Sequence, residues 1–495
     1  MSVRNQLWTV ISVIVFEATC SQRLLAEATF TRDIAPLIFQ KCTSCHRPGE
    51  AAPFALQTYA DVKKRADLIE SVISERLMPP WKADRGDAAF RYERRLEDEQ
   101  VTLITDWIKN GMPEGNPADL PPLPEFPVGW SLGEPDLIVK MKEPFIVPAD
   151  GPDIYRNFVI PLELDSERWV TAIDFRPSAR SVVHHSLFFF EASGLARKID
   201  AEDEQPGFKG GMGAMARLRG GPPVLTPDGS ETGPGRQGRR LQPGVGLGLL
   251  GNQAANESPK FGPLGGWALG AQPHPLPDGL AFRLPAGSDL ILATHFHPSG
   301  KVEEEASTVG LYFTKEPTRR RFTAIQLPGA FGAFKGIDIP AGKKEYVIED
   351  SFELPVDVEA FGVGAHAHYL GKSMKLTATL PDGQTQTILS IPDWDFAWQE
   401  QYRFANYLKL PKGTRLHSRI EYDNSADNPR NPSHPPARVR FGEESTNEMG
   451  SITLQVVAAE ESQMPKLMEG YQIHFRQSVM KTPLLKMLQD RIRSD

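Results

Sequence analysis

The sequence is poor in cysteine, in basic runs and in long apolar segments. Its 495 residues include three cysteines, too few for the disulfide framework of many exported proteins. Lysine and arginine number 55 against 63 aspartates and glutamates, without a basic block, so we expect no nucleic-acid partner. No stretch approaches the roughly 18 to 20 apolar residues that a transmembrane helix requires, so we expect no transmembrane segment in the mature chain.

Glycine and proline are abundant instead, at 42 and 43 residues. This frequency is unfavourable for a helical bundle and suits many turns between short strands. With 40% hydrophobic residues the chain can bury substantial cores, and its length predicts about three domains. We therefore expect a multidomain protein that is neither all-α nor disordered.

The N-terminus has the pattern of an export signal over residues 1–28. Arg4 precedes an apolar run from Leu7 to Phe16, and Ala26-Glu27-Ala28 supplies the small residues of a cleavage site. The mature chain is then expected to begin near Thr29. This pattern predicts an exported protein, either periplasmic or extracellular.

The two cysteines that remain after the signal form one motif. Cys42-Thr43-Ser44-Cys45-His46 is the pattern that attaches haem c through two thioethers, with His46 as an axial ligand of the iron. A thiol redox pair is the alternative, but it leaves the adjacent histidine unexplained. Cys20 lies within the signal, and the residues before it match a lipoprotein site poorly.

Haem iron in an electron carrier needs a second axial ligand, for which a methionine thioether is typical. Met78 follows an expected helix over 60–76 and precedes two prolines that stiffen its loop. Met112, after an expected helix over 98–110, is the alternative. The block 29–116 resembles a small class I cytochrome c, which implies an all-α domain with one covalent haem c.

Residues 117–129 are rich in proline, which predicts a semi-rigid extended linker. After the linker the pattern changes to short runs of β-branched and aromatic residues between turn-forming residues. We expect two all-β, jelly-roll-like sandwiches, over 130–319 and 320–460. Their clearest strands are expected at 157–164, 169–175, 181–190, 358–368, 373–380, 414–422 and 451–458.

Two segments lie outside this strand pattern. Residues 206–266 are dense in glycine and proline and predict a long surface insertion in the first sandwich. The tail over 461–495 is expected to be helical in part, with an amphipathic helix over 483–492.

Most of the histidines in the β region are grouped. The groups are His184-His185, His295-Phe296-His297 and His366-Ala367-His368. Alternate residues of a strand point to the same face, so His366 and His368 can present both imidazoles to one metal. His184 and His185 are adjacent, so they can share a metal only at a strand end or a bulge.

The donor types narrow the choice of metal. Imidazoles without cysteine thiolates suit copper, zinc, iron or nickel. Met449 precedes the strand expected at 451–458, in the same half of the chain as His366 and His368. A thioether favours copper, because Cu(I) binds this ligand well.

The order and spacing of these motifs over about residues 140–460 resemble the copper type II, ascorbate-dependent monooxygenases, the family of peptidylglycine hydroxylase and dopamine β-hydroxylase. The resemblance implies two coppers per chain with separate roles. One transfers electrons and the other binds O2 and substrate. The implied ligands are His184, His185 and His295 for the first copper, and His366, His368 and Met449 for the second. His295 is preferred to His297, and a contribution from His274 stays open.

The resemblance implies a monooxygenase that hydroxylates a C–H bond of a small organic substrate. The electron donor is expected to be an ascorbate-like reductant or a redox protein, with electrons passing through the fused haem to copper. Gly364, Ser451 and Thr453 replace the polar clamp of the peptide hydroxylases, so a C-terminal glycine peptide is not the expected substrate. A non-catalytic electron-transfer or copper-handling protein is the alternative.

Overall fold

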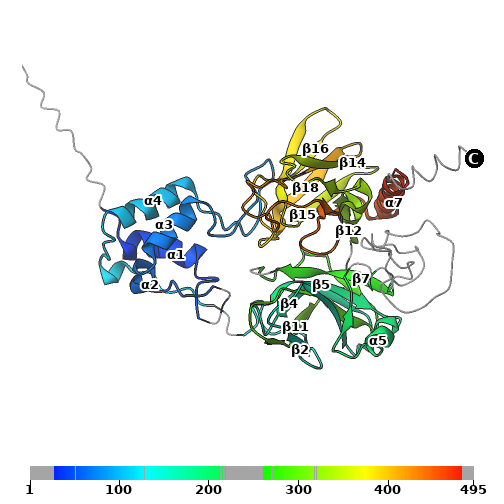
Figure 1. Cartoon of the computed structure of the whole chain (residues 1–495), viewed down its shortest axis with the longest axis horizontal. Helices are drawn as coiled ribbons and strands as arrows, with labels where there is room; N and C mark the ends of the chain where they lie inside the picture. Colours follow the sequence, from blue (N-terminus) through cyan, green and yellow to red (C-terminus); the bar gives the residue numbers. More distant parts are fainter. Residues whose placement is uncertain are drawn as a thin grey trace, which may run out of the picture.

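The computed structural model describes residues 27–48, 50, 52–126, 129–211, 214, 215, 218, 260–268, 271–316, 318 and 320–481. The chain is mainly antiparallel β-sheet. Most of its helices lie near the N-terminus, and the longest one lies near the C-terminal end of the described residues (Figure 1). This confirms the expectation of a mainly β protein with a helical N-terminal part. Most of the expected signal, most of the insertion at 206–266 and the whole helix expected over 483–492 lie outside the described residues.

The N-terminal part is held together by the apolar faces of its helices. Ile34, Ile69, Ile104 and Trp107 meet in one buried core. Among the described residues, no helix has the length and hydrophobicity required to cross a membrane. The helical segments are η1 (Phe30–Ile34), α1 (Ala35–Lys41), α2 (Tyr59–Lys63), α3 (Ala66–Ser74), α4 (Asp98–Lys109) and η2 (Pro117–Asp119).

The continuous helix expected over 60–76 is wrong in one respect, because α2 and α3 are separate helices. The chain leaves helical geometry at Arg65, with φ −121° and ψ 18°. Thr58 and Asp61 form a capping box that starts α2 independently. The break lets Val62 of α2 and Ile69 of α3 enter the same core, a requirement of packing that sequence periodicity does not reveal.

The first β unit, over 130–316, consists of two main sheets around one core. Phe158 and Phe188 come from one sheet, and Phe175 and Leu311 come from the other. The five-stranded sheet has the order β6 (Phe208–Lys209), β3 (Ile154–Pro161), β9 (Asp289–Phe296), β5 (Val183–Glu191), β7 (Phe261–Ala268). The four-stranded sheet has the order β1 (Leu137–Lys140), β11 (Thr308–Phe313), β4 (Arg168–Arg176), β8 (Phe282–Leu284). The unit also contains the strand pair β2 (Phe145–Val147) and β10 (Glu303–Glu305) and the helix α5 (Leu195–Asp200).

The second β unit, over 320–458, repeats this plan with two four-stranded sheets around one core. β19 shows the usual strand alternation, because every second side chain along it is buried. One sheet has the order β12 (Phe322–Leu327), β21 (Gly450–Ala458), β15 (Val358–Ala367), β18 (Gln401–Leu410). The other sheet has the order β14 (Tyr346–Glu353), β19 (Arg415–Tyr422), β16 (Gly371–Thr379), β17 (Thr385–Ile391). The smaller elements of this unit are η3 (Gly329–Lys335), β13 (Asp338–Ile339) and β20 (Val439–Arg440).

The observed strands overlap all seven strands expected from the sequence. The tail after the second β unit contains η4 (Glu461–Gln463) and α7 (Met464–Met480). Tyr471 of α7 donates a hydrogen bond through its hydroxyl to the carbonyl of Gln326, at 2.7 Å. This contact, with buried Leu467 and Phe475, fastens α7 to the second β unit.

Residues 81–94, here called the strap, connect α3 to α4 but pack on the second β unit (Figure 1). The Arg91 N–H donates to the Arg403 carbonyl at 2.7 Å, and the Ala405 N–H donates to the Ala89 carbonyl at 2.8 Å. Trp81 belongs to the same core as the strands of the second unit. These residues were expected to belong to the helical block 29–116, and their packing on the second β unit was not predicted from the sequence.

Candidate metal-binding site

His184, His185 and His295 form one cluster in the five-stranded sheet. Their potential ligand atoms all lie within 4.8 Å of one another. β5 pairs with β9 through Val183–Phe296 and His185–His295, and the register shifts between these pairs. This irregularity at His184 is the bulge that two adjacent histidines need in order to face one point.

His295 is the most deeply buried member of this cluster. Its side chain is 2% exposed, and its ring stacks on Tyr155 with centroids 4.3 Å apart. Its Nε2 lies 3.0 Å from Asp153 Oδ2, but the contact lacks hydrogen-bond geometry, so both ring nitrogens are buried without a hydrogen-bond partner. A buried polar atom without a partner is costly, and a bound cation would satisfy it.

Asp153 provides a negative charge beside the cluster. Burial opposes its ionisation, but contacts with His295, Ser445 and His297 outweigh burial and lower the pKa of Asp153. Asp153 accepts a hydrogen bond from Ser445 of the second β unit and contacts His297 Nδ1 at 2.8 Å. This carboxylate therefore lies where it can compensate a cation held by the three imidazoles.

The other two histidines of the cluster are held in the neutral form. Burial, reinforced by the neighbouring His295, lowers the pKa of His184 to about 3. The same causes lower the pKa of His185 well below its ordinary value. Neutral imidazoles keep a lone pair for a metal at neutral pH.

His366 and His368 lie at the end of β15, with ring centroids 5.2 Å apart. His366 Nδ1 lies 2.6 Å from Gln399 Oε1, and the Gln399 amide donates to the Phe396 carbonyl, which orients it. His368 Nδ1 lies 3.1 Å from the Asn447 carbonyl. Both partners are acceptors, so each Nδ1 carries the proton and each Nε2 keeps a free lone pair.

Met449 follows a buried glutamate that ties it to His368. The Glu448 carboxyl accepts N–H groups from His368 at 3.0 Å, Met449 at 3.2 Å and Leu370 at 2.6 Å. Ala367 of β15 pairs with Gly450 of β21. His368, which follows Ala367, and Met449, which precedes Gly450, therefore lie next to this pair on neighbouring chain segments. The Met449 side chain is 5% exposed. A methionine thioether and two imidazoles are thus brought to one end of the β15–β21 pair.

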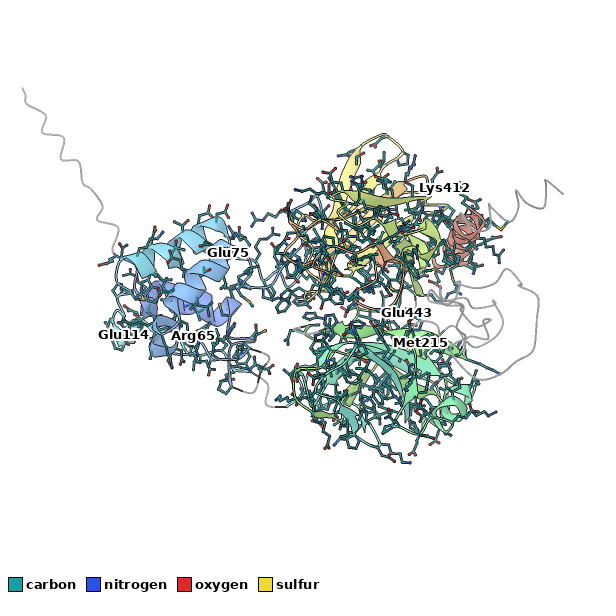
Figure 2. The ribbon with its side chains drawn as sticks, in the orientation of Figure 1. Arg65, Glu75, Glu114, Met215, Lys412 and Glu443 are labelled. Atoms are coloured by element: carbon teal, nitrogen blue, oxygen red, sulfur yellow. The ribbon has the colours of Figure 1, made fainter. Side chains whose placement is uncertain are left out.

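The first cluster (His184, His185 and His295) and the second cluster (His366, His368 and Met449) face each other across the junction of the β units. Tyr155 of the first unit donates a hydrogen bond to the Glu443 carbonyl of the second, at 2.7 Å. Figure 2 shows Glu443 at this junction. The rings of His184 and Phe396 stack across the same junction, with centroids 4.4 Å apart.

The Cys42-x-x-Cys45-His46 segment follows α1 in the helical part. Burial raises the pKa of the Cys42 thiol to about 12, whereas a redox-active thiol requires a lowered pKa. His46 Nδ1 lies 3.1 Å from the Phe54 carbonyl, which again leaves Nε2 with a free lone pair. Met112 packs against the helical core, and Met78 is half-buried at the beginning of the loop that leads into the strap.

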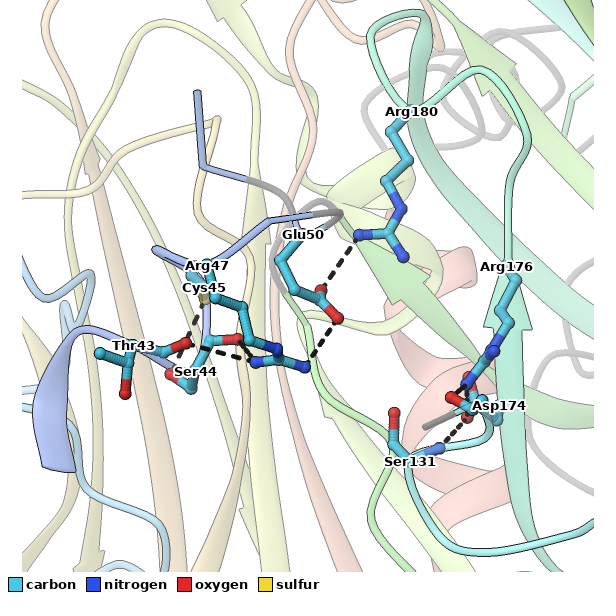
Figure 3. A network of polar contacts seen from close by, with 10 residues as sticks. Thr43, Ser44, Cys45, Arg47, Glu50, Ser131, Asp174, Arg176 and Arg180 are labelled. Atoms are coloured by element: carbon cyan, nitrogen blue, oxygen red, sulfur yellow. Dashed lines mark hydrogen bonds and ion pairs between the residues drawn. The ribbon is translucent and has the colours of Figure 1, made fainter. Parts of the chain in front are cut away.

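A chain of ion pairs connects this segment to the first β unit (Figure 3). Glu50 contacts Arg47 at 2.7 Å and Arg180 at 3.3 Å. Arg47 also donates to the carbonyls of Thr43 and Ser44. Arg180 lies in the loop that leads into β5 and His184. The cysteine motif is therefore connected to the chain segment that enters the first cluster.

His274 and His297, whose contribution to copper binding was an open question, contact other residues. The His274 ring stacks on the ring of Tyr92 in the strap, with centroids 3.9 Å apart. His297 is 62% exposed and pairs with Asp153, outside the group of His184, His185 and His295.

The sequence did not predict a role for Asp153, Gln399, Phe396 or Glu448. Only Glu448 had a signal, its position next to Met449.

The comparisons with known proteins add little. No protein-family profile and no curated protein matches the chain. Solved structures with weak similarity include the infectious bursal disease virus VP2 subviral particle, at 10% identity and TM-score 0.18, covering 70% of this chain and 76% of that chain. Another is PBCV-1 VP54 fitted into a reconstruction of the virophage Sputnik, at 8% identity and TM-score 0.21, covering 65% and 93%. TM-scores this low carry no argument about fold or function.

Proposed function

We propose that this chain is an exported monooxygenase with copper and haem c, which hydroxylates a C–H bond of a small organic substrate. In this proposal a cytochrome c domain precedes two jelly-roll-like sandwiches. The reaction consumes the substrate, O2, two electrons and two protons, and it yields the alcohol and water. The observation that carries the proposal is the gathering of two histidine clusters, one with a methionine, at a single junction between the β units.

The residues fit these groups by their chemistry. His184, His185 and His295 would hold one copper, and His366, His368 and Met449 would hold the other. When bound, the coppers supply one-electron redox chemistry and O2 activation, and the haem supplies an electron carrier. Haem would be held by Cys42 and Cys45 through thioethers, and by His46 and Met78 at the iron.

The chain prepares these donors before any metal binds. Acceptors at the Nδ1 atoms of His46, His366 and His368 fix the tautomer and the ring orientation. Glu448 holds the backbone of His368 and Met449 on one carboxyl group, which keeps both side chains at one place. Each imidazole therefore presents Nε2 without rearrangement, and preorganisation of this kind favours tight binding.

The surroundings of His366 support a substrate without a carboxylate. Ser451 lies opposite His366 and Thr453 lies opposite Gly364 in the pairing of β15 with β21. A Cβ atom at Gly364 would meet the side-chain amide of Gln401, so any side chain at this position would have to displace that amide. Recognition at this place therefore depends on neutral polar groups and not on an arginine fork.

The proposal predicts two coppers and one haem iron per chain by elemental analysis. Copper-loaded protein with a reductant should consume O2 faster when its substrate is added, and 18O2 should label the product by mass spectrometry. His366→Gln should lose substrate-dependent O2 uptake, whereas His434→Gln, at an exposed histidine, should retain it. If both coppers are reduced reversibly but no compound in a broad library of small organic molecules stimulates O2 uptake, the result would instead support the non-catalytic electron-transfer alternative. Bound zinc that copper cannot displace would contradict both the monooxygenase proposal and the electron-transfer alternative.

A further inference from the structure

One aromatic ring contacts both histidine clusters. The Phe396 ring stacks on His184, with centroids 4.4 Å apart and planes at 29°. The same ring meets His368 edge-on, with centroids 5.5 Å apart and planes at 69°. Phe396 is 5% exposed, so its ring fills space between the clusters and does not project into solvent.

The loop that carries Phe396, residues 392–400 between β17 and β18, is held firmly. The Trp394 indole donates to the His368 carbonyl at 3.3 Å, and the Trp394 N–H donates to the Lys372 carbonyl at 2.8 Å. Gln399 donates to the Phe396 carbonyl at 3.3 Å while it orients His366. These contacts hold the backbone of the loop on both sides of Phe396.

The same loop is anchored from outside the cluster region. Asp393 accepts two hydrogen bonds from Arg430, at 2.7 and 3.0 Å, and a third at 3.1 Å from Lys82 of the strap. Arg94 of the strap pairs with Glu400 at the other end of the loop. The strap therefore braces the loop that lies between the clusters.

We propose that Phe396 is a positioning residue that sets the orientation of His184 and His368 and the separation of the two clusters. This inference rests on the proposed function for its role toward metals, but not for the contact itself. A stacked ring restricts rotation of the imidazole beneath it. It also excludes water, so the clusters share one dry region and are not two sites on opposite sides of a solvent-filled gap.

The first arm of the test uses the full chain without copper and measures histidine ring signals by NMR. Phe396 should displace the ring signals of His184 and His368 through its ring current. Phe396→Leu should move both sets of signals, whereas Phe396→Tyr should preserve them. Phe361→Leu is the matched control, because Phe361 is buried in the same β unit and contacts Phe322 and Tyr407 instead. Phe396→Met, which is flexible and has no ring, serves if the leucine variant does not fold.

The second arm uses copper-loaded chain and measures the distance between the two coppers by pulsed electron paramagnetic resonance. The parent and Phe396→Tyr should give one narrow distance distribution, and the distribution should broaden at least twofold in Phe396→Leu. Unchanged ring signals and an unchanged distribution in Phe396→Leu would overturn the inference. If the chain binds fewer than two coppers, the proposed function fails while the metal-free arm still decides the role of Phe396.

Discussion

Acidification of the metal-free protein should expose the cost of burying neutral histidines. Burial lowers the pKa of His184 to about 3 and that of His366 to about 4, from an ordinary value of 6.5. It lowers the pKa of His185 and His368 well below that value. As pH falls through 6.5 the unfolded chain binds protons at these positions and the folded chain does not. The free energy of unfolding therefore has its full value above pH 6.5 and decreases as the pH falls below 6.5.

The magnitude follows from these shifts, at about 1.4 kcal/mol per pKa unit. Between pH 7 and pH 5 each of the four histidines costs about 2 kcal/mol, which gives roughly 7 kcal/mol in total. Glu448 acts in the opposite sense, because burial raises its pKa to about 8. Between pH 7 and pH 5 the folded chain holds a proton on Glu448 that the unfolded chain largely lacks, so lowering the pH restores about 2 to 3 kcal/mol of the free energy of unfolding. For these five groups together, the expected net loss in free energy of unfolding is roughly 4 to 5 kcal/mol.

The assay is urea unfolding with chelator present, followed by circular dichroism at pH 7 and pH 5. Copper must be removed because a metal-bound imidazole does not take up a proton. The double variant His184→Gln with His366→Gln should reduce the loss by about 3 to 4 kcal/mol, and Glu448→Gln should increase it by about 2 to 3 kcal/mol. His434→Gln, at an exposed position, should leave it unchanged. A free energy of unfolding that does not fall between pH 7 and pH 5, or a double variant with the same loss as the parent, would refute the reasoning.

Three further predictions concern the haem, the second copper and the strap. Protein exported from a host that matures haem c should carry one haem mass that survives denaturation, and Met78→Ala should change the visible spectrum while the haem stays attached. A spectrum that changes only in Met112→Ala would move the axial ligand to that residue. Met449→Ala should lower the copper content measured by elemental analysis from two to one per chain, and retention of two would exclude the thioether as a necessary ligand. Trp81→Ala should reduce the free energy of unfolding of the second β unit by about 3 to 5 kcal/mol, measured by denaturant unfolding, whereas Leu123→Ala, at an exposed position, should change it little. Equal effects of these two alanine variants would contradict the packing of the strap.

Local spacing accounts for what could be predicted at the clusters. His366 and His368 were expected to share a face because alternate residues of a strand do so. In the structure His366 lies on β15, His368 directly follows its last residue, and their ring centroids lie 5.2 Å apart. His184 and His185 were expected to share a metal only at a strand end or a bulge, and the structure places them near the start of β5, at a register shift in its pairing with β9. The break between α2 and α3 was missed because the residues on both sides of it favour a helix and only packing against the core separates them.

The partners of the histidines could not be predicted in the same way. Asp153 and Ser445 meet across the junction of the two β units, and Phe396 meets His184 across the same junction. No periodicity links residues so far apart in sequence. The strap was assigned to the helical part for the same reason, since Trp81 and Phe90 have apolar character but nothing in their sequence names the core that they enter.

Residue type and spacing along one strand or helix were enough to predict the kinds of element, the clearest strand positions and the candidate metal-binding histidines. Tertiary structure alone decided that two histidine clusters share one junction, that Phe396 lies between them and that residues 81–94 belong to the second β unit. It also decided the protonation of His184 and His366, because burial lowers the pKa of both imidazoles and keeps them neutral. Burial and contacts between distant elements arise only when the β units pack together, and packing depends on the whole chain.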